Sequence, residues 1–317
     1  MKNIIFFTLF ILFFACKKDE CKNDNETLVC TPCEEVSSIS DFEEVKKQER
    51  SPCFNPNNMN EFVYVNKLDD RNFQLVKYDI VSKQSLTLYK GTVLTKPSWG
   101  KNNIIVFTDS LFQLRIVKPD ASLNKRLTNG NAFLYPIWKN DSTIIAEYSK
   151  DLNKPNLYCE YYLNKNKYYL DTLNGYDSGY RNSDYNRKGQ YIFMKYSSDS
   201  IFYLRETTSI RKILIKNSKI FGTVYSVVGV CWHPTEEVIY YTVYNDGLYK
   251  LDVNTLKATR IRNGCSTRTY GNLSISADGK KIIVERIDAK PNNGGLLKDA
   301  GIYIMDIDGK NERKIEL

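Results

Sequence analysis

The sequence predicts an all-β protein, a six-bladed β-propeller of four-stranded antiparallel blades, on three observations. A two-stranded hairpin with a polar turn recurs along the chain, a short anchor motif precedes each hairpin, and the motif returns at a regular spacing. A period of roughly forty residues with four short strands per unit is typical of propellers. Each such sheet has two apolar faces that it cannot bury alone, and a closed ring of sheets buries every face against a neighbour.

The start of the chain is predicted to direct export and lipid attachment. Lys2 precedes the apolar run Ile4–Phe14, which is too short for a stable membrane span. The tail Leu12–Cys16 resembles a bacterial lipobox, in which Cys16 receives the lipid and becomes the mature N-terminus. We therefore expect a signal peptide over residues 1–15 and a membrane anchor of acyl chains on Cys16. An ordinary signal peptide with a coincidental cysteine is the alternative.

Residues 16–51 are predicted to form a flexible tether, because they are rich in Glu, Lys, Asn and Ser and poor in apolar residues. A short helix near Asp41–Gln48 is compatible with this composition. The segment Lys17–Glu20 resembles the signal that sends some Gram-negative lipoproteins to the outer leaflet. We expect an anchor in the bacterial outer membrane, with the cell surface favoured over the periplasmic side.

The predicted propeller spans residues 52–317, and its anchor motif is an apolar residue followed by a polar turn and an apolar strand. Successive anchors are 45, 39, 47, 47 and 43 residues apart by subtraction. The six anchors, one for each predicted blade, are Phe54, Trp99, Trp138, Tyr185, Trp232 and Ile275.

The repeated hairpin is clearest at the end of the chain, where the apolar run after Gly301 predicts a strand buried on both faces. Asp308-Gly309 predicts the turn, because Gly accepts a positive φ and Asp tolerates one. A second, more polar strand follows. Comparable hairpins are Leu75–Leu88, Leu114–Leu127 and Leu248–Ile261.

These repeats resemble a known family. The turn Ser276–Lys280 and the hairpin Ile302–Ile315 are similar to the TolB-like propeller repeat, also called PD40 and related to Trp-Asp repeats. The resemblance covers about residues 52–317 and implies a TolB-like six-bladed propeller lipoprotein. It says almost nothing about function, because one fold carries many functions. The additional N-terminal domain of TolB has no counterpart here.

The charge pattern argues against nucleic-acid binding. The excess of Lys and Arg over Asp and Glu is 45 − 37 = +8, and it is spread along the chain without a basic cluster. We expect a solvated basic surface that faces an anionic envelope.

The sequence predicts no catalytic residues, no metal site and no cofactor. His233 is the only histidine, and it occupies a turn position of the anchor motif. No Gly-x-Ser-x-Gly nucleophile elbow is present. Aspartates such as Asp252 and Asp308 recur at hairpin turns in several blades, so we expect them to hold turns. Cys30 and Cys33 have a two-residue spacing, but no second pair completes a zinc site.

The tryptophans have two interpretations. Trp99, Trp138 and Trp232 could form a platform for a carbohydrate, but their fixed place before each hairpin favours packing between blades.

The expected function is binding of a protein or peptide partner by a non-catalytic, lipid-anchored module of the envelope. The alternative is a carbohydrate-binding or carbohydrate-active surface lipoprotein. Loops before the first strand and after the second strand of each blade share one face of the disc, and this face collects Tyr and Arg, which dominate interface energetics. The binding residues expected there are Tyr180, Arg181, Arg268 and Tyr270.

Overall fold

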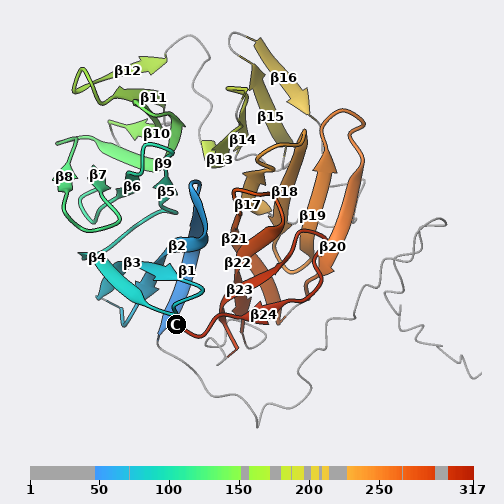
Figure 1. Cartoon of the computed structure of the whole chain (residues 1–317). Helices are drawn as coiled ribbons and strands as arrows, with labels where there is room; N and C mark the ends of the chain where they lie inside the picture. Colours follow the sequence, from blue (N-terminus) through green and yellow to red (C-terminus); the bar gives the residue numbers. More distant parts are fainter. Residues whose placement is uncertain are drawn as a thin grey trace, which may run out of the picture. The chain divides into compact units, whose positions relative to one another are not determined.

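The computed structural model describes residues 47–317, apart from 71, 151–156, 172–179, 187, 196–200, 207–208, 214–226, 266 and 290–298. The strands of these residues form six four-stranded antiparallel sheets, each made of strands that are consecutive in the chain (Figure 1). The prediction of an all-β propeller with four-stranded antiparallel blades is confirmed. Among the described residues there is no helix long and apolar enough to cross a membrane.

The strands have the following bounds. The first two sheets contain β1 (Gln48–Asn55), β2 (Asn58–Lys67), β3 (Phe73–Asp79) and β4 (Ser85–Lys90), then β5 (Ser98–Trp99), β6 (Ile105–Thr108), β7 (Leu114–Val117) and β8 (Asn124–Arg126). The next two contain β9 (Ala132–Asn140), β10 (Thr143–Ser149), β11 (Leu157–Tyr162) and β12 (Lys167–Asp171), then β13 (Tyr180–Tyr185), β14 (Tyr191–Lys195), β15 (Ile201–Glu206) and β16 (Ser209–Ile213). The last two contain β17 (Val227–Trp232), β18 (Val238–Val243), β19 (Gly247–Asp252) and β20 (Ala258–Asn263), then β21 (Arg268–Ile275), β22 (Lys281–Asp288), β23 (Gly301–Asp306) and β24 (Arg313–Lys314). The four hairpins expected from the sequence are the third and fourth strands of their sheets.

Strand β2 shows why its residues are apolar without alternation. Phe62 and Tyr64 pack in a cluster with the last sheet, whereas Val63 and Val65 pack in a cluster with the second sheet. Side chains that alternate along a strand point to opposite faces. Both faces of this strand are therefore buried, each against a different neighbour.

Every sheet shares an apolar cluster with the sheet that follows it. The clusters that join neighbours are centred on Phe107, Ile144, Tyr191, Tyr241, Tyr303 and Phe62, and the last of these joins the final sheet to the first. Among the described strands none passes from one sheet into another, so the junction between the first and last sheets depends on side-chain packing and hydrogen bonds.

We call this junction the seam, and Glu285 of β22 is its main polar group. The Glu285 carboxylate accepts hydrogen bonds from Ser51 N at 3.2 Å and from Gln48 Nε2 at 3.2 Å. Asn272 Nδ2 donates to Ser51 Oγ at 3.1 Å, and Tyr78 OH donates to Glu316 O at 3.1 Å. The seam is thus held by polar contacts as well as by the apolar cluster.

Strand β1 begins at Gln48, four residues before the expected start of the propeller at residue 52. The polar residues Gln48–Ser51 were assigned to the tether by composition, but they pair with β2 and bind Glu285. Of the helix expected near Asp41–Gln48, residue 48 lies in β1 and residues 41–46 lie outside the described part of the chain.

The seam gives a prediction about pH. Burial raises the pKa of Glu285 above its ordinary value, although Ser51 N and Arg50 oppose the shift. An acid with a raised pKa in the fold binds more protons folded than unfolded, so its contribution to stability falls as pH rises from about 4.5 through the raised pKa. Urea unfolding of Glu285→Gln should show a weaker loss of stability over this range than the wild type. Glu236→Gln, at an exposed turn, should show the same dependence of the free energy of unfolding on pH as the wild type. The same dependence in all three proteins would contradict a raised pKa of Glu285.

Candidate functional site

Six side chains, one from the first strand of each sheet, surround the centre of the propeller. Each stands directly before an anchor residue, so the alternation of the strand turns it away from the blade face that the anchor packs against. All of them line one central cavity. We call them the inner ring: Cys53, Ser98, Ile137, Asp184, Cys231 and Ser274.

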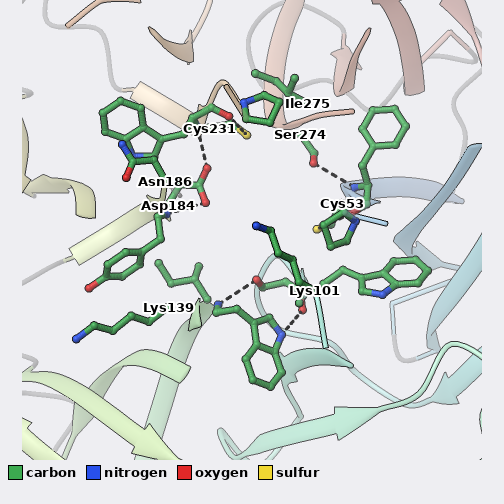
Figure 2. Close-up of a pocket in the computed structure, with 18 of the residues that line it drawn as sticks. Cys53, Lys101, Lys139, Asp184, Asn186, Cys231, Ser274 and Ile275 are labelled. Carbon is green, nitrogen blue, oxygen red and sulfur yellow. Dashed lines mark hydrogen bonds between the residues drawn. The ribbon is translucent and has the colours of Figure 1, made fainter. Parts of the chain in front are cut away.

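Polar members of the inner ring bind the backbone of the next sheet. Ser274 Oγ accepts a hydrogen bond from Phe54 N at 3.1 Å, across the seam. Ser98 Oγ accepts one from Trp138 N at 3.3 Å, and Trp138 Nε1 donates to Ser98 O at 3.1 Å (Figure 2). Each of these side chains therefore satisfies an N–H group that faces the centre, where an unpaired donor would cost about 1–3 kcal/mol.

Two thiols occupy the same position in their own sheets. The N–H of Trp99 is directed at the sulfur of Cys53, and that of Ile275 at the sulfur of Cys231. Burial raises the pKa of both thiols, so they stay protonated and unreactive. Like Cys159, both are free and buried, whereas Cys265 is disulfide-bonded.

Asp184 accepts hydrogen bonds at two sheet junctions, because the side chain of Ile137 has no hydrogen-bond acceptor. Its Oδ2 accepts a hydrogen bond from Trp232 N at 2.8 Å, as the ring pattern requires. Its Oδ1 accepts one from Tyr185 N at 2.9 Å, which is the donor that Ile137 cannot satisfy. The two oxygens of the carboxylate let one side chain accept from both N–H groups, one on each oxygen. Burial raises the pKa of Asp184, while the charge of Lys96 and the two N–H donors oppose the shift.

The inner ring surrounds a cavity of 630 Å³, a volume within the range of about 300–1,000 Å³ that is common for ligand pockets. Figure 2 shows Cys53, Asp184, Cys231 and Ser274 around it, together with Lys101 and Lys139, which also line it. Turns between the first and second strands line its mouth, including residues Pro56, Lys101, Asp141, Lys188, Pro234 and Ala277. The cavity therefore opens on the face that carries these turns, which we call the turn face.

The turn face is opposite the face that the sequence favoured for binding. Lys101 and Asp141 belong to turns that sequence analysis treats as ordinary polar turns, because a turn alone does not show that six of them converge on one hollow. A signal was nevertheless present in the sequence. In every repeat one residue directly precedes the anchor on the first strand, so its side chain points away from the face that the anchor packs against.

The charged residues that line the cavity are four lysines and two aspartates: Lys96, Lys101, Lys139, Lys188, Asp141 and Asp184. Lys139 Nζ lies 2.6 Å from Glu160 Oε1, and Lys188 pairs with Glu237, so both are compensated from outside the cavity. Within the part of the chain that the structure describes, Lys96 and Lys101 are in no ion pair.

A smaller cavity of 240 Å³ lies on the other side of the inner ring, lined by Arg50, Thr95 and Glu285 among others. Lys96, Tyr135 and Asn272 line both cavities and so form the partition between them. Tyr135 has φ of 51°, a left-handed conformation that is rare for a bulky residue, at a bulge between β9 and β10. Strained backbone of this kind is often found at binding sites.

The anchor residues pack between blades, as expected. Trp99 and Trp232 are buried, with only 5% and 3% of their surface exposed, and Trp138 is half-buried with its indole N–H bound to the preceding sheet. A carbohydrate platform needs an open ring face, and the indoles of Trp99 and Trp232 do not offer one.

Two of the four expected binding residues contribute to packing in the last blade. The ring of Tyr270 is 1% exposed and lies in the apolar cluster between the fifth and sixth sheets, while its hydroxyl donates to Glu312 Oε1 at 3.1 Å. This corrects its expected role, since a buried ring cannot meet a partner. Arg268 is half-buried, with Nε 3.0 Å from Asp288 Oδ1. Neither residue lines either cavity.

Three other expected site residues remain predictions. Tyr180 and Arg181 begin strand β13 and pair with Lys195 and Met194, but their side chains lie outside the described part of the structure. Cys16 also lies outside the described residues.

His233 is a turn residue, as expected, and it also joins two sheets. Its Nδ1 accepts hydrogen bonds from Thr235 N at 3.3 Å and Glu236 N at 3.0 Å, so Nε2 carries the proton. Nε2 donates to Gly279 O of the last sheet at 3.1 Å. Gly279 has φ of 74°, and a Cβ there would lie 2.5 Å from His233 Nε2, so only glycine fits.

The recurring aspartates hold hairpin turns, as predicted. Asp252 Oδ1 accepts from Asn254 N and Thr255 N, Asp308 Oδ1 accepts from Lys310 N, and Asp120 Oδ1 accepts from Ser122 N. The pKa of each carboxyl is lowered, mainly by Thr255 N at Asp252 and by the side chains of Lys310 at Asp308 and Ser122 at Asp120, with the backbone donors adding to the last two. Among the described residues, no group of three or more His, Cys, Asp or Glu side chains is placed to hold a metal ion.

The sequence matches no model of a known protein family and no curated protein. Solved structures do match. TolB from Acinetobacter baumannii aligns with a TM-score of 0.55 at 16% identity, over 85% of this chain and 62% of TolB. The β-propeller domain of the Trilobed protease from Pyrococcus furiosus, described as having an open velcro topology, aligns with a TM-score of 0.51 at 10% identity over 87% and 97% of the two chains. An oligogalacturonate lyase in complex with manganese aligns with a TM-score of 0.52 at 10% identity over 86% and 85%.

These similarities establish the propeller fold. At such identities they say nothing about activity, since binding proteins and enzymes share the fold. The chain spans about 62% of the length of TolB, so it matches only part of that protein.

Proposed function

We propose that this chain is a lipid-anchored protein of the bacterial envelope, closed as a six-bladed propeller, that binds a protein or peptide partner without catalysing a reaction. The main observation in support is the 630 Å³ cavity on the turn face, with its polar inner ring and the lysines at its rim. Binding sites are commonly the largest hollow with a few converging polar groups.

A non-catalytic role is supported by what the candidate catalytic groups do. His233 uses both ring nitrogens to hold a turn and a sheet junction, and the recurring aspartates hold hairpins. The inner-ring thiols are protonated, and both oxygens of Asp184 accept backbone N–H groups. Each of these groups has a structural task that accounts for its presence.

Site-specific photocrosslinking in cells tests the proposal. Replacing Lys101 at the rim of the cavity by p-benzoylphenylalanine should give covalent protein adducts. Val81, which is 71% exposed at an outer hairpin turn, is the matched position that should give none. Tyr244, which is 51% exposed in the loop between β18 and β19, probes the opposite face. Adducts from Tyr244 alone would show that the partner binds the opposite face, where Tyr180 and Arg181 are expected. Adducts from none of these positions would argue against a protein partner.

The membrane anchor is tested separately. In cells grown with a fatty-acid analogue, the wild-type protein should carry the label and Cys16→Ala should not, because Cys16 is the predicted acceptor of the lipid. We expect complete loss of label and release of the variant from the membrane fraction. Cys53→Ala is a suitable control, since Cys53 is a buried thiol of the propeller, and its label should equal that of the wild type. Label retained by the Cys16 variant would refute the anchor. Extracellular protease treatment of intact cells then tests the proposed surface location.

A further inference from the structure

Lys96 places a cation in the middle of the propeller. It precedes β5 of the second sheet, yet its Nζ donates to Leu273 O of the last sheet at 2.5 Å. Its charge also acts on Cys53 and Asp184, which belong to the first and fourth sheets. The ammonium group therefore reaches across the cavity at the partition, where it forms part of the cavity floor.

The hydrogen-bonding capacity of this ammonium is largely unused. It has three N–H donors, and among the described residues it donates only to Leu273 O. The nearby Asp184 forms no ion pair with Lys96, although the charge of Lys96 acts to lower the pKa of its carboxyl. A half-buried cation with two free donors is suited to bind a carboxylate, since charge-assisted hydrogen bonds are the strong ones.

A second cation lies along the path to this floor. Lys101 is exposed at the rim, in no ion pair with any described residue, and its backbone O accepts from Asn57 Nδ2 at 3.0 Å. Lys139 and Lys188 at the rim carry their own acidic partners. Lys96 and Lys101 are therefore the lysines of the described lining that have no acidic partner, although Asp141 and Asp184 also line the cavity.

We propose that the cavity receives an acidic peptide segment whose carboxylate, either a C-terminus or a glutamate side chain, binds Lys96 Nζ and displaces or joins Leu273 O. This inference rests on the proposed peptide-binding function and names the chemistry of the partner. The half-buried walls formed by Trp138, Ile137 and Tyr185 suit apolar side chains next to that carboxylate.

A peptide fits these observations better than an acidic sugar. Sugars stack on open aromatic faces. The indoles of Trp99 and Trp232 are buried between blades, so the half-buried Trp138 is the one tryptophan of the cavity lining that is partly exposed. Lys96, Tyr135 and Asn272 lie between this cavity and the smaller one, and we expect the end of a chain or one long side chain to reach them from the turn face.

The experiment uses the propeller with two libraries of random heptapeptides, one displayed with free C-termini and one with both ends blocked. Enriched sequences are synthesised as the free acid, the C-terminal amide and the Glu→Gln form, and their affinities are measured by calorimetry. We expect removal of the critical carboxylate to weaken binding about tenfold or more, and Lys96→Met to weaken the free acid by a similar factor. Lys118→Met, which removes one exposed lysine at a β7–β8 turn, should bind as the wild type does. The library that yields the ligand distinguishes a C-terminus from a glutamate.

The outcomes separate the two proposals. Peptides that bind wild type and Lys96→Met equally, or that bind equally as acid and amide with no acidic residue, would overturn the role of Lys96 and leave peptide binding intact. The acid–amide and Glu→Gln comparisons on the wild type test the requirement for a carboxylate even where the Lys96 variant does not fold, and equal affinities in both would overturn the proposal. A lack of binding from both libraries would overturn the peptide partner itself. Trigalacturonate is measured in parallel, and Lys96-dependent binding of it without peptide binding would assign the cavity to an acidic glycan.

Discussion

A chain that ends at Asn263 is expected to lose its folded state entirely. The deletion removes β21 to β24, and with them one side of two apolar clusters. On the fifth sheet it uncovers Tyr240 and Leu248, and on the first sheet Phe62 and Tyr78. Burying one large apolar side chain contributes about 1.5–3 kcal/mol. The burial free energy lost from all the uncovered side chains together exceeds the free energy of unfolding of a domain, which is roughly 5–15 kcal/mol.

The loss should be visible as insolubility, or as a soluble protein without a cooperative melting transition. The matched control is a circular permutant that starts at Gly264, joins Leu317 to Gln48 by a flexible linker and ends at Asn263. It has the same new C-terminus but keeps all six sheets, so it should melt cooperatively. A truncated chain with a sharp transition near that of the permutant would show that the seam contributes little.

The parts of the fold that could be predicted depend on short stretches of sequence. The hairpin around Asp308 needs only its own turn residues and two strands, and Lys310 N donates to that aspartate as the pattern requires. The anchors could be predicted because each apolar residue recurs at one place in the repeat. Trp99 and Trp232 are buried accordingly.

The seam and the cavity could not be predicted in the same way. Gln48 and Ser51 look like tether residues until Glu285, more than two hundred positions later, accepts their hydrogen bonds. The residues of the inner ring, such as Cys53 and Asp184, are of different types, so a search for a repeated residue does not find them. Their common feature is a position next to an anchor, which acquires meaning only when six strands surround one axis.

The binding face was assigned wrongly for Tyr270 because residue type does not distinguish a core ring from an interface ring. Tyrosine combines a large apolar body with a polar end, and both environments favour it. In this protein the polar end binds Glu312, which also accepts from Arg262 and Arg286. The hydroxyl of Tyr270 is thus satisfied inside the blade.

Tyr270→Ala is therefore expected to destabilise the propeller by about 3–5 kcal/mol, the usual cost of removing a buried aromatic ring. A change of that size lowers the Tm of a domain of this length by roughly 10 °C. Tyr270→Phe keeps the ring and removes only the hydrogen bond to Glu312, whose carboxylate retains Arg262 and Arg286. It should cost about 1 kcal/mol.

Thermal melts of these two variants beside Arg268→Ala distinguish packing from binding. The arginine change should have a small effect, because Asp288 keeps Arg286 at 2.7 Å as its partner. If Tyr270 were an interface residue, its alanine variant would melt near the wild type and lose only affinity. A buried Tyr270 predicts the opposite, a loss of stability without a loss of affinity. Alanine should lower the Tm most, phenylalanine a little, and the phenylalanine protein should bind any turn-face ligand as tightly as the wild type, since its ring lies outside both cavities.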